Sequence, residues 1–159
     1  IVGDQVETLK ECEYLESKGL TNIGYTHDWR SEETQILKKY FRASCQNEEE
    51  VLEARNKGWA TTIIVNEEVP NSILLSNGEK AVMCPVVKEE RRIKKDVDSM
   101  TFNSYKEKRS YIKTRKEGIK TNCNLCTLCK VNDKTENITV MFEVHGAANT
   151  IKQASEKIS

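Results

Sequence analysis

Three cysteines at a spacing of three residues carry the most sharply defined chemistry in this chain. The run TNCNLCTLCK contains Cys123, Cys126 and Cys129, and Cys84, the first residue of a Cys-Pro pair, stands far upstream. Neighbouring thiolates repel one another, whereas a metal ion deprotonates thiols and holds them together. The pattern therefore predicts a metal site with four sulfur ligands.

The spacing also bears on the identity of the metal. All-cysteine zinc sites usually take their ligands from two Cys-x2-Cys pairs. Three thiols in one run and a remote fourth are closer to the ligation of a [4Fe–4S] cluster, so the sequence favours a [4Fe–4S] cluster slightly over Zn²⁺. Disulfides or free thiols are the remaining alternative, but disulfides suit secreted chains, and no signal peptide is visible here.

A second set of reactive side chains follows the predicted strands. In parallel α/β folds, side chains that do chemistry collect just past the carboxyl ends of the strands. Ring, hydroxyl, thiol and guanidinium groups recur at such positions in this chain, and together they predict a small-molecule or nucleotide pocket at one rim of the sheet. The residues concerned are Tyr25, His27, Trp29, Arg30, Ser44, Cys45, Cys84 and His145.

Each side chain would have a distinct role in such a pocket. Arg30 would pair with an anionic group, and Trp29 would offer a stacking surface. His27 or His145 would transfer protons. The other candidates are Cys45 for catalysis and Tyr25 and Ser44 for ligand binding. The alternative is that each residue is structural, because a lone histidine is often a hydrogen-bonded structural residue and cysteine packs as a small hydrophobe.

Strands and helices that would position these residues alternate at roughly 20-residue spacing. Extended apolar runs are predicted at 23–25, 41–45, 60–65, 80–86 and 138–144, and helices at 8–20, 31–40, 47–59 and 145–158. This alternation is typical of right-handed βαβ units. The predicted class is therefore α/β, with a parallel sheet or a partial (half) β/α barrel, a four-cysteine metal-binding loop and a basic helical insertion.

Local signals predict where two of these helices begin and end. Thr8 and Glu11 have the spacing of a capping box for the first helix, and Gly19 is a favourable stop. Asn47 is a favourable N-cap for the third helix, and Gly58 is a favourable stop.

Residues 88–120 form a basic insertion in a chain whose formal net charge is zero. They contain twelve Lys or Arg and six Asp or Glu, a local charge of +6. Cations interleaved with Phe102, Tyr105 and Tyr111 can hold phosphates and stack bases, so nucleic acid or a protein is a candidate partner. The alternative is a solvated helix with apolar residues at heptad spacing. The cations include Arg91, Arg92, Lys94, Lys95, Lys106, Lys108, Arg109, Lys113, Arg115 and Lys116.

The bulk properties predict one α/β domain over residues 1–159. The sequence contains no apolar run long enough to span a membrane, and a cytoplasmic location is expected. It also lacks Walker, Rossmann, His-Glu-x-x-His and Gly-x-Ser-x-Gly motifs, which excludes easily recognised nucleotide-binding enzymes and hydrolases. Because the chain begins with Ile1 rather than Met, we expect it to be a fragment of a longer chain.

Five motifs occur in an order that resembles the C-terminal portion of a family of proteins carried by bacteriophages and mobile elements, to which no activity is assigned. The motifs are weak singly and specific jointly, and the resemblance covers most of residues 1–146 apart from one segment. They are GYTHDWR at 24–30, FRASCQNEEEVLEARNKGW at 41–59, the Cys-Pro pair at 84–85, NCNLCTLC at 122–129 and FEVHG at 142–146.

The resemblance implies a partial barrel similar to that of radical S-adenosylmethionine proteins, an N-terminal part that this chain lacks, and a phage-infected bacterial cell as the location. Radical chemistry would need a three-cysteine loop near the start of the chain, which is absent, so the four-cysteine site would be auxiliary or structural. The segment 85–122 is also longer than the loop of the family. The matched positions are Tyr25, Thr26, His27, Trp29, Arg30, Ser44, Cys84, Cys123, Cys126, Cys129, His145 and Gly146.

Two functions remain open from the sequence. One is a phage-type metal-binding protein with a small-molecule pocket at the rim, and the other is a metal-stabilised module whose basic insertion contacts nucleic acid or a protein. A virion or host-takeover component without catalysis is a weaker third. The sequence does not decide whether the chain is an enzyme.

Overall fold

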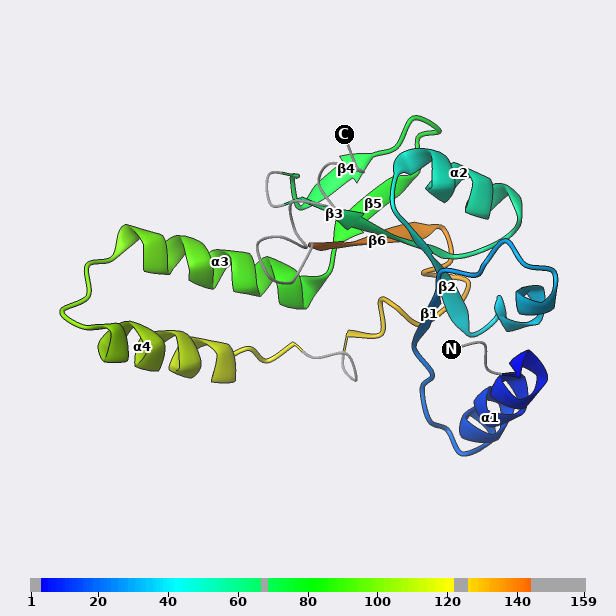
Figure 1. The fold of residues 1–159 in the computed structure, drawn as a ribbon, viewed down its shortest axis with the longest axis horizontal. Coiled ribbons are helices and arrows are strands. Elements are labelled where there is room, and N and C mark those ends of the chain that lie inside the picture. The colour runs from blue at the N-terminus through cyan, green and yellow to red at the C-terminus, as the bar shows by residue number, and fades with distance from the viewer. Residues whose placement is uncertain (1–3, 67–68, 122–125, 144–159) are drawn as a thin grey trace.

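The strands form one six-stranded sheet, which Figure 1 shows at the centre of the molecule. The computed structural model describes residues 4–66, 69–121 and 126–143. The strand order is β1-β2-β3-β6-β5-β4, and every neighbouring pair is parallel except β4 and β5. The predicted α/β class is therefore confirmed. The strands are β1 (Gly24–Thr26), β2 (Phe41–Cys45), β3 (Thr61–Val65), β4 (Ser72–Leu74), β5 (Lys80–Met83) and β6 (Ile138–Glu143).

Most of the described helices were predicted from the sequence, but the residues at which they begin and end often differ from the prediction. α2 is capped as predicted, because the Asn47 side chain accepts a hydrogen bond from the Glu50 N–H at 2.9 Å, and Gly58 follows the helix with a φ of 79°. The helix expected at 31–40 is a short 3₁₀ helix. The helices are α1 (Gln5–Ser17), η1 (Glu33–Leu37), α2 (Glu48–Asn56), α3 (Pro85–Ser99) and α4 (Tyr105–Glu117). The helix expected at 145–158 lies outside the described residues.

The capping box predicted at Thr8 and Glu11 is wrong. α1 begins earlier, because the Asp4 carboxylate accepts a hydrogen bond from the Val6 N–H at 2.9 Å and so caps the helix itself. The hydroxyl of Thr8 donates to the Asp4 carbonyl oxygen at 3.1 Å, inside the helix.

The two faces of the sheet carry different side chains. The strand register aligns Ala43, Thr61, Thr139 and Ala81 on one face. α2 covers this face, where Thr61 and Thr139 share a hydrogen bond of 2.7 Å. The alternate residues, among them Arg42, Thr62 and Val140, point to the opposite face. We call this opposite face the Arg42 face.

Gly24 in the GYTHDWR motif has a packing role. A Cβ atom at this position would lie 2.5 Å from the aromatic ring of Phe41, the register partner of Gly24 on β2. A larger residue would therefore require the Phe41 ring to move, which accounts for the glycine at the start of the motif.

The basic insertion is helical, as predicted. α3 and α4 form a hairpin, which Figure 1 shows projecting away from the sheet, and we call residues 85–117 the arm. Cys84 follows β5 and is the N-cap of α3, with Pro85 in the first helical turn. Ile93 and Val97 are buried between the two helices. In the described part of the chain, no helix combines the length and apolar character needed to cross a membrane.

Candidate functional site

The described cysteines of the predicted metal site are largely buried. Cys84 and Cys129 are each 8% exposed and belong to the same cluster of core side chains, while Cys126 is half-buried. None of the three forms a disulfide. Cys123 lies outside the described residues. Within residues 4–66, 69–121 and 126–143, no group of three or more His, Cys, Asp or Glu is close enough to hold a metal ion.

Cys84 and Cys129 lie on the same side of the sheet. Cys84 continues the alternation of β5, in which Lys80 and Val82 share a face with Val140, and its N–H donates to the Met141 carbonyl oxygen at 2.9 Å. Cys129 is held on that side because its carbonyl oxygen accepts a hydrogen bond from the Arg42 side chain. Cys84 therefore continues the Arg42 face, and Arg42 holds the backbone of Cys129 next to it.

The turn between Cys126 and Cys129 has an unusual backbone. Thr127 has a φ of 49°, in the left-handed region that β-branched residues rarely adopt. The N–H of Lys130 donates to the Thr127 carbonyl oxygen at 3.0 Å and closes the turn. The strained conformation is therefore held by neighbouring hydrogen bonds.

Arg42 is the residue of this region that sequence reasoning missed. Its side chain has no solvent exposure, and its nitrogen atoms donate to five backbone carbonyl groups. The available signal was a single charged residue within the otherwise uncharged strand Phe41–Cys45. Lysine and arginine are almost never fully buried without a specific partner. An arginine inside a predicted buried strand therefore indicates a structural or functional role.

The predicted rim residue Trp29 lies inside the protein. Its indole ring is 1% exposed, and the Arg30 guanidinium stacks on it at 4.0 Å from the ring centre. Arg30 in turn forms ion pairs with Glu53 at 2.7 Å and Glu50 at 3.3 Å on α2. The hydrogen bond from Arg30 holds the pKa of the Glu53 carboxyl below its usual value. The anion that Arg30 binds thus comes from the chain itself.

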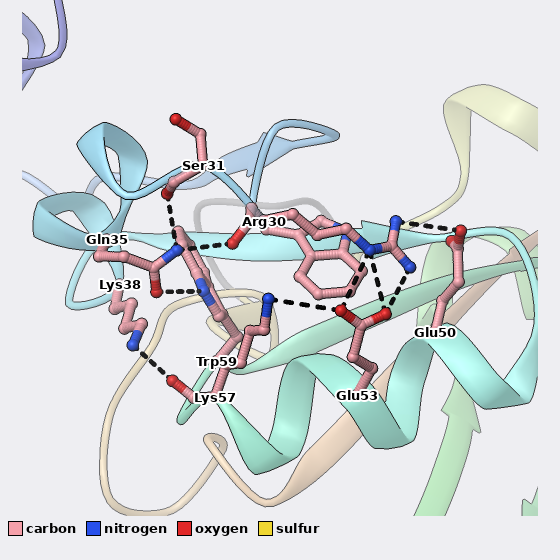
Figure 2. A network of polar contacts seen from close by, with 9 residues as sticks. Arg30, Ser31, Gln35, Lys38, Glu50, Glu53, Lys57 and Trp59 are labelled. Carbon is pink, nitrogen blue, oxygen red and sulfur yellow. Dashed lines mark hydrogen bonds and ion pairs between the residues drawn. The ribbon is translucent and has the colours of Figure 1, made fainter.

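A hydrogen-bond network extends this contact to the end of α2 (Figure 2). The amide nitrogen of Gln35 donates to the carbonyl oxygens of Trp29 and Ser31, at 2.8 Å each, and the amide oxygen of Gln35 accepts from the indole N–H of Trp59 at 3.2 Å. Lys38 donates to the Lys57 carbonyl oxygen. The motifs GYTHDWR and NKGW are therefore joined as one structural unit.

The other rim candidates occupy different environments. His27 is exposed, and Ser44 is buried on the Arg42 face. Tyr25, 43% exposed, packs edge-on against Phe142 with the ring centres 5.6 Å apart. His145 and its neighbour Gly146 lie outside the described residues. The described candidates therefore differ in exposure, from the buried Ser44 to the exposed His27.

Cys45 is buried beneath α2, and this environment predicts an alkaline loss of stability. Burial raises the pKa of the Cys45 thiol from 9.0 to about 12. Because the folded state retains the proton more strongly than the unfolded state, the stabilising contribution is complete below pH 9.0 and is lost as the pH rises towards about 12. We expect a loss of about 1.4 kcal/mol per pH unit in this window. Urea unfolding of the wild type and Cys45→Ala at pH 7 and pH 10 measures it, and equal pH dependence in both proteins would refute the assignment.

The arm uses several of its cations internally. Arg115 pairs with Asp96 at 2.8 Å and Lys116 pairs with Glu90 at 2.7 Å, which ties α4 to α3. Arg91 binds Glu143 of β6 and so fastens the arm to the sheet. These three cations therefore do not have the free surface role that the sequence suggested.

Six other arm cations form two exposed stripes at helical spacing. Within the described chain, Lys95, Lys106 and Arg109 form no ion pair, and the side chain of Arg92 remains 62% exposed despite a contact with Glu89. Tyr105, at the start of α4, is 79% exposed. The stripes consist of Lys88, Arg92 and Lys95 on α3 and of Lys106, Arg109 and Lys113 on α4.

A groove of about 410 Å³ lies between the two helices. Ile93, Val97 and Ile112 give it an apolar lining, and Lys108 and Glu143 are also among its lining residues. Its mixed charge does not indicate a particular ligand.

Comparisons of this chain with protein-family models, with curated proteins and with solved structures give no match.

Proposed function

We propose that this chain is a phage-type metal-binding module in which a four-cysteine site fixes the base of the arm. The ligands would be Cys84, Cys123, Cys126 and Cys129, and a [4Fe–4S] cluster is favoured over Zn²⁺ on the ligand spacing. A metal bound there would contribute folding energy by joining thiolates that are distant in the chain.

The observation that carries the proposal is the placement of the described cysteines around the arm. Cys84 immediately precedes α3, and Cys126 and Cys129 follow α4. Cys84 and Cys129 are both buried in one cluster of core side chains. The left-handed Thr127 gives the Cys126–Cys129 turn a constrained shape. The positive end of α3 next to Cys84 favours negatively charged sulfur ligands.

Metal analysis of anaerobically purified protein tests this proposal. We expect stoichiometric iron and sulfide with visible absorption, or stoichiometric zinc without it. Replacing any of the four cysteines by serine should remove most of the bound metal, because each change deletes a ligand. Cys12→Ser, a change at a buried cysteine of α1, is the matched control and should retain the metal. A metal-free wild-type protein, or full metal content in the ligand variants, would contradict the proposal.

We further propose that the arm binds nucleic acid. Support comes from the two basic stripes and the exposed Tyr105, a combination of phosphate-binding cations and a ring able to stack on a base. A catalytic pocket at the rim receives less support, because Trp29 is covered by Arg30 and the Cys45 thiol is buried. Binding rather than catalysis is therefore the function that the geometry favours.

Salt-dependent binding to fluorescent oligonucleotides, single-stranded and duplex, measures the role of the arm. Neutralising four exposed stripe residues should weaken binding and reduce the slope of log affinity against log salt by about 1 per lost phosphate contact. The variant is Arg92→Gln, Lys95→Gln, Lys106→Gln and Arg109→Gln, and the control removes the same charge elsewhere, at Lys10, Lys18, Lys80 and Lys134.

The control changes exposed lysines outside the arm. Equal loss of affinity in both quadruple variants would indicate a nonspecific charge effect and would remove the arm from the proposal. Loss confined to the arm variant supports it.

A further inference from the structure

Tyr105 holds its ring out into solvent at the end of the arm. It is the first residue of α4, and Figure 1 shows this end of the helix far from the sheet. Of the large apolar and aromatic side chains in the described part of the chain, it is the most exposed, at 79%. An aromatic ring gains free energy by leaving water, so a ring exposed to this extent is available to pack against a partner.

Hydrogen bonds fix the turn that carries the ring. Ser104 is the N-cap of α4, and its side-chain oxygen accepts from the Glu107 N–H at 3.1 Å. The Glu107 carboxylate in turn accepts from the Asn103 N–H at 2.8 Å. Paired bonds of this kind satisfy the free N–H groups at the start of a helix. Tyr105 therefore stands on an ordered turn, which reduces the entropy cost of binding through it.

The other two rings of the arm are used for its own packing. Phe102 packs against Tyr111 of α4, with the ring centres 5.7 Å apart and an interplanar angle of 56°. Both rings are half-buried. Tyr105 has no aromatic partner of this kind among the described residues. Two rings thus hold the end of the arm together, and the third faces outward.

Two cations flank the exposed ring. Lys106 follows Tyr105 directly, and Arg109 lies on the same side of α4 as the ring, because residues four apart are neighbours on a helix surface. Both cations are exposed, and neither forms an ion pair within the described residues. Glu107, the one acidic residue between them in sequence, is engaged by the Asn103 N–H. The end of the arm thus combines a stacking surface with phosphate-binding groups.

This combination selects unpaired bases. In a duplex, neighbouring base pairs cover the faces of each base, so a ring can stack only by inserting between pairs and unstacking them. A single strand leaves the faces of its bases open, and every base has such a face. Phosphate-binding cations alone attract both forms, so the ring is the group that distinguishes them.

We propose that the end of the arm is a contact site for single-stranded nucleic acid: a base stacks on Tyr105, and Lys106 and Arg109 hold the phosphates beside it. This inference rests on the proposed binding of nucleic acid by the arm and adds the class of strand that it binds. Base faces and phosphates are common to DNA and RNA, so the contact does not depend on the sugar.

Fluorescence anisotropy with labelled oligodeoxythymidine, oligouridine and a DNA duplex of matched length tests the inference. Tyr105→Ala should raise the Kd for the single strands about 5- to 150-fold, the loss of one stacked base, and leave the Kd for the duplex within about twofold. Tyr105→Phe keeps the ring and should bind within about twofold of the wild type. Tyr14→Ala is the matched control, because Tyr14 is a tyrosine on α1 that is 62% exposed, with the Lys18 ammonium 5.4 Å from its ring centre. Its Kd should stay unchanged.

Salt dependence separates stacking from charge. Tyr105→Ala removes no charge, so the slope of log affinity against log salt should stay as in the wild type. Arg109→Gln should reduce that slope by about 0.7 on a single strand, because one phosphate contact is lost. An abasic strand keeps the phosphates and removes the bases, and the wild type should bind it as weakly as Tyr105→Ala binds the intact strand.

The outcomes separate the two proposals. Absence of nucleic-acid binding by the wild type, or binding that the quadruple arm variant leaves unchanged, overturns the proposed function of the arm. If the quadruple variant loses affinity while Tyr105→Ala keeps it, or if Tyr105→Ala weakens single-strand and duplex binding equally, the arm still binds nucleic acid and the stacking site is overturned. A selective loss on either single strand that is absent in Tyr105→Phe supports the site.

Discussion

Trp29→Ala is expected to lower the free energy of unfolding by about 3–5 kcal/mol, the range for removing a large buried aromatic side chain. Trp29 is 1% exposed and is covered by Arg30. The Lys57 Nζ also lies over the ring, 5.7 Å from its centre. Truncation would leave a cavity that the η1 backbone cannot fill, because Gln35 already holds the Trp29 and Ser31 carbonyl groups. Urea denaturation followed by circular dichroism provides the measurement.

Two controls show whether the motif is structural. Tyr14→Ala removes an aromatic ring that is 62% exposed on α1 and should change stability by less than about 0.5 kcal/mol. Arg30→Ala should have an effect below about 1 kcal/mol, because its side chain is 46% exposed and exposed ion pairs contribute little. A Trp29→Ala protein as stable as the wild type would contradict the structural role and return Trp29 to the list of ligand-binding candidates.

Arg91→Met is expected to destabilise the fold by about 3–5 kcal/mol, although Arg91 lies in a segment rich in surface cations. Its side chain is 18% exposed, and the side chain of its partner Glu143 is 13% exposed. Arg91 also donates to the carbonyl oxygens of Val69 at 2.6 Å and Asn66 at 3.2 Å. Removing the cation leaves a largely buried carboxylate without its partner.

The neighbouring residue is the natural control for this prediction. Arg92→Met removes the same charge from the same helix, but its contact with Glu89 is exposed, so we expect a change below about 1 kcal/mol. Combining Arg91→Met with Glu143→Gln should recover part of the lost stability, since the carboxylate is then neutral. Equal effects at the two arginines would show that Arg91 does not anchor the arm.

The elements that the sequence predicted well are those with local signals. β3 and β6 are short runs rich in apolar and β-branched residues, and α2 carries its own cap at Asn47 and its own stop at Gly58. β4 was missed because it has three residues and alternates exposed and half-buried positions at the sheet edge. An antiparallel edge strand of that length has no periodicity to detect.

The candidate site was less predictable, because its contacts join distant parts of the chain. The rule that reactive side chains follow strands located Trp29 and Cys45 correctly along the chain, but it could not show that both are buried. Arg30 was assigned to an external anion, since nothing in the spacing of GYTHDWR identifies Glu53 as its partner. The contacts between Arg42 and the segment from Leu128 to Ile138 span more than eighty residues and leave no local pattern.

The position of β6 has a consequence for how the molecule assembles. β6 follows every other described strand in the chain, yet it lies between β3 and β5 and joins the pair β4–β5 to the trio β1–β3. Until residues 138–143 leave the ribosome, the two parts of the sheet share no hydrogen bonds. The arm then follows a strand, β5, that still lacks its neighbour β6. Stable folding during synthesis must therefore wait for the end of the described chain, and nascent fragments that stop before β6 would expose β3 and β5 to aggregation.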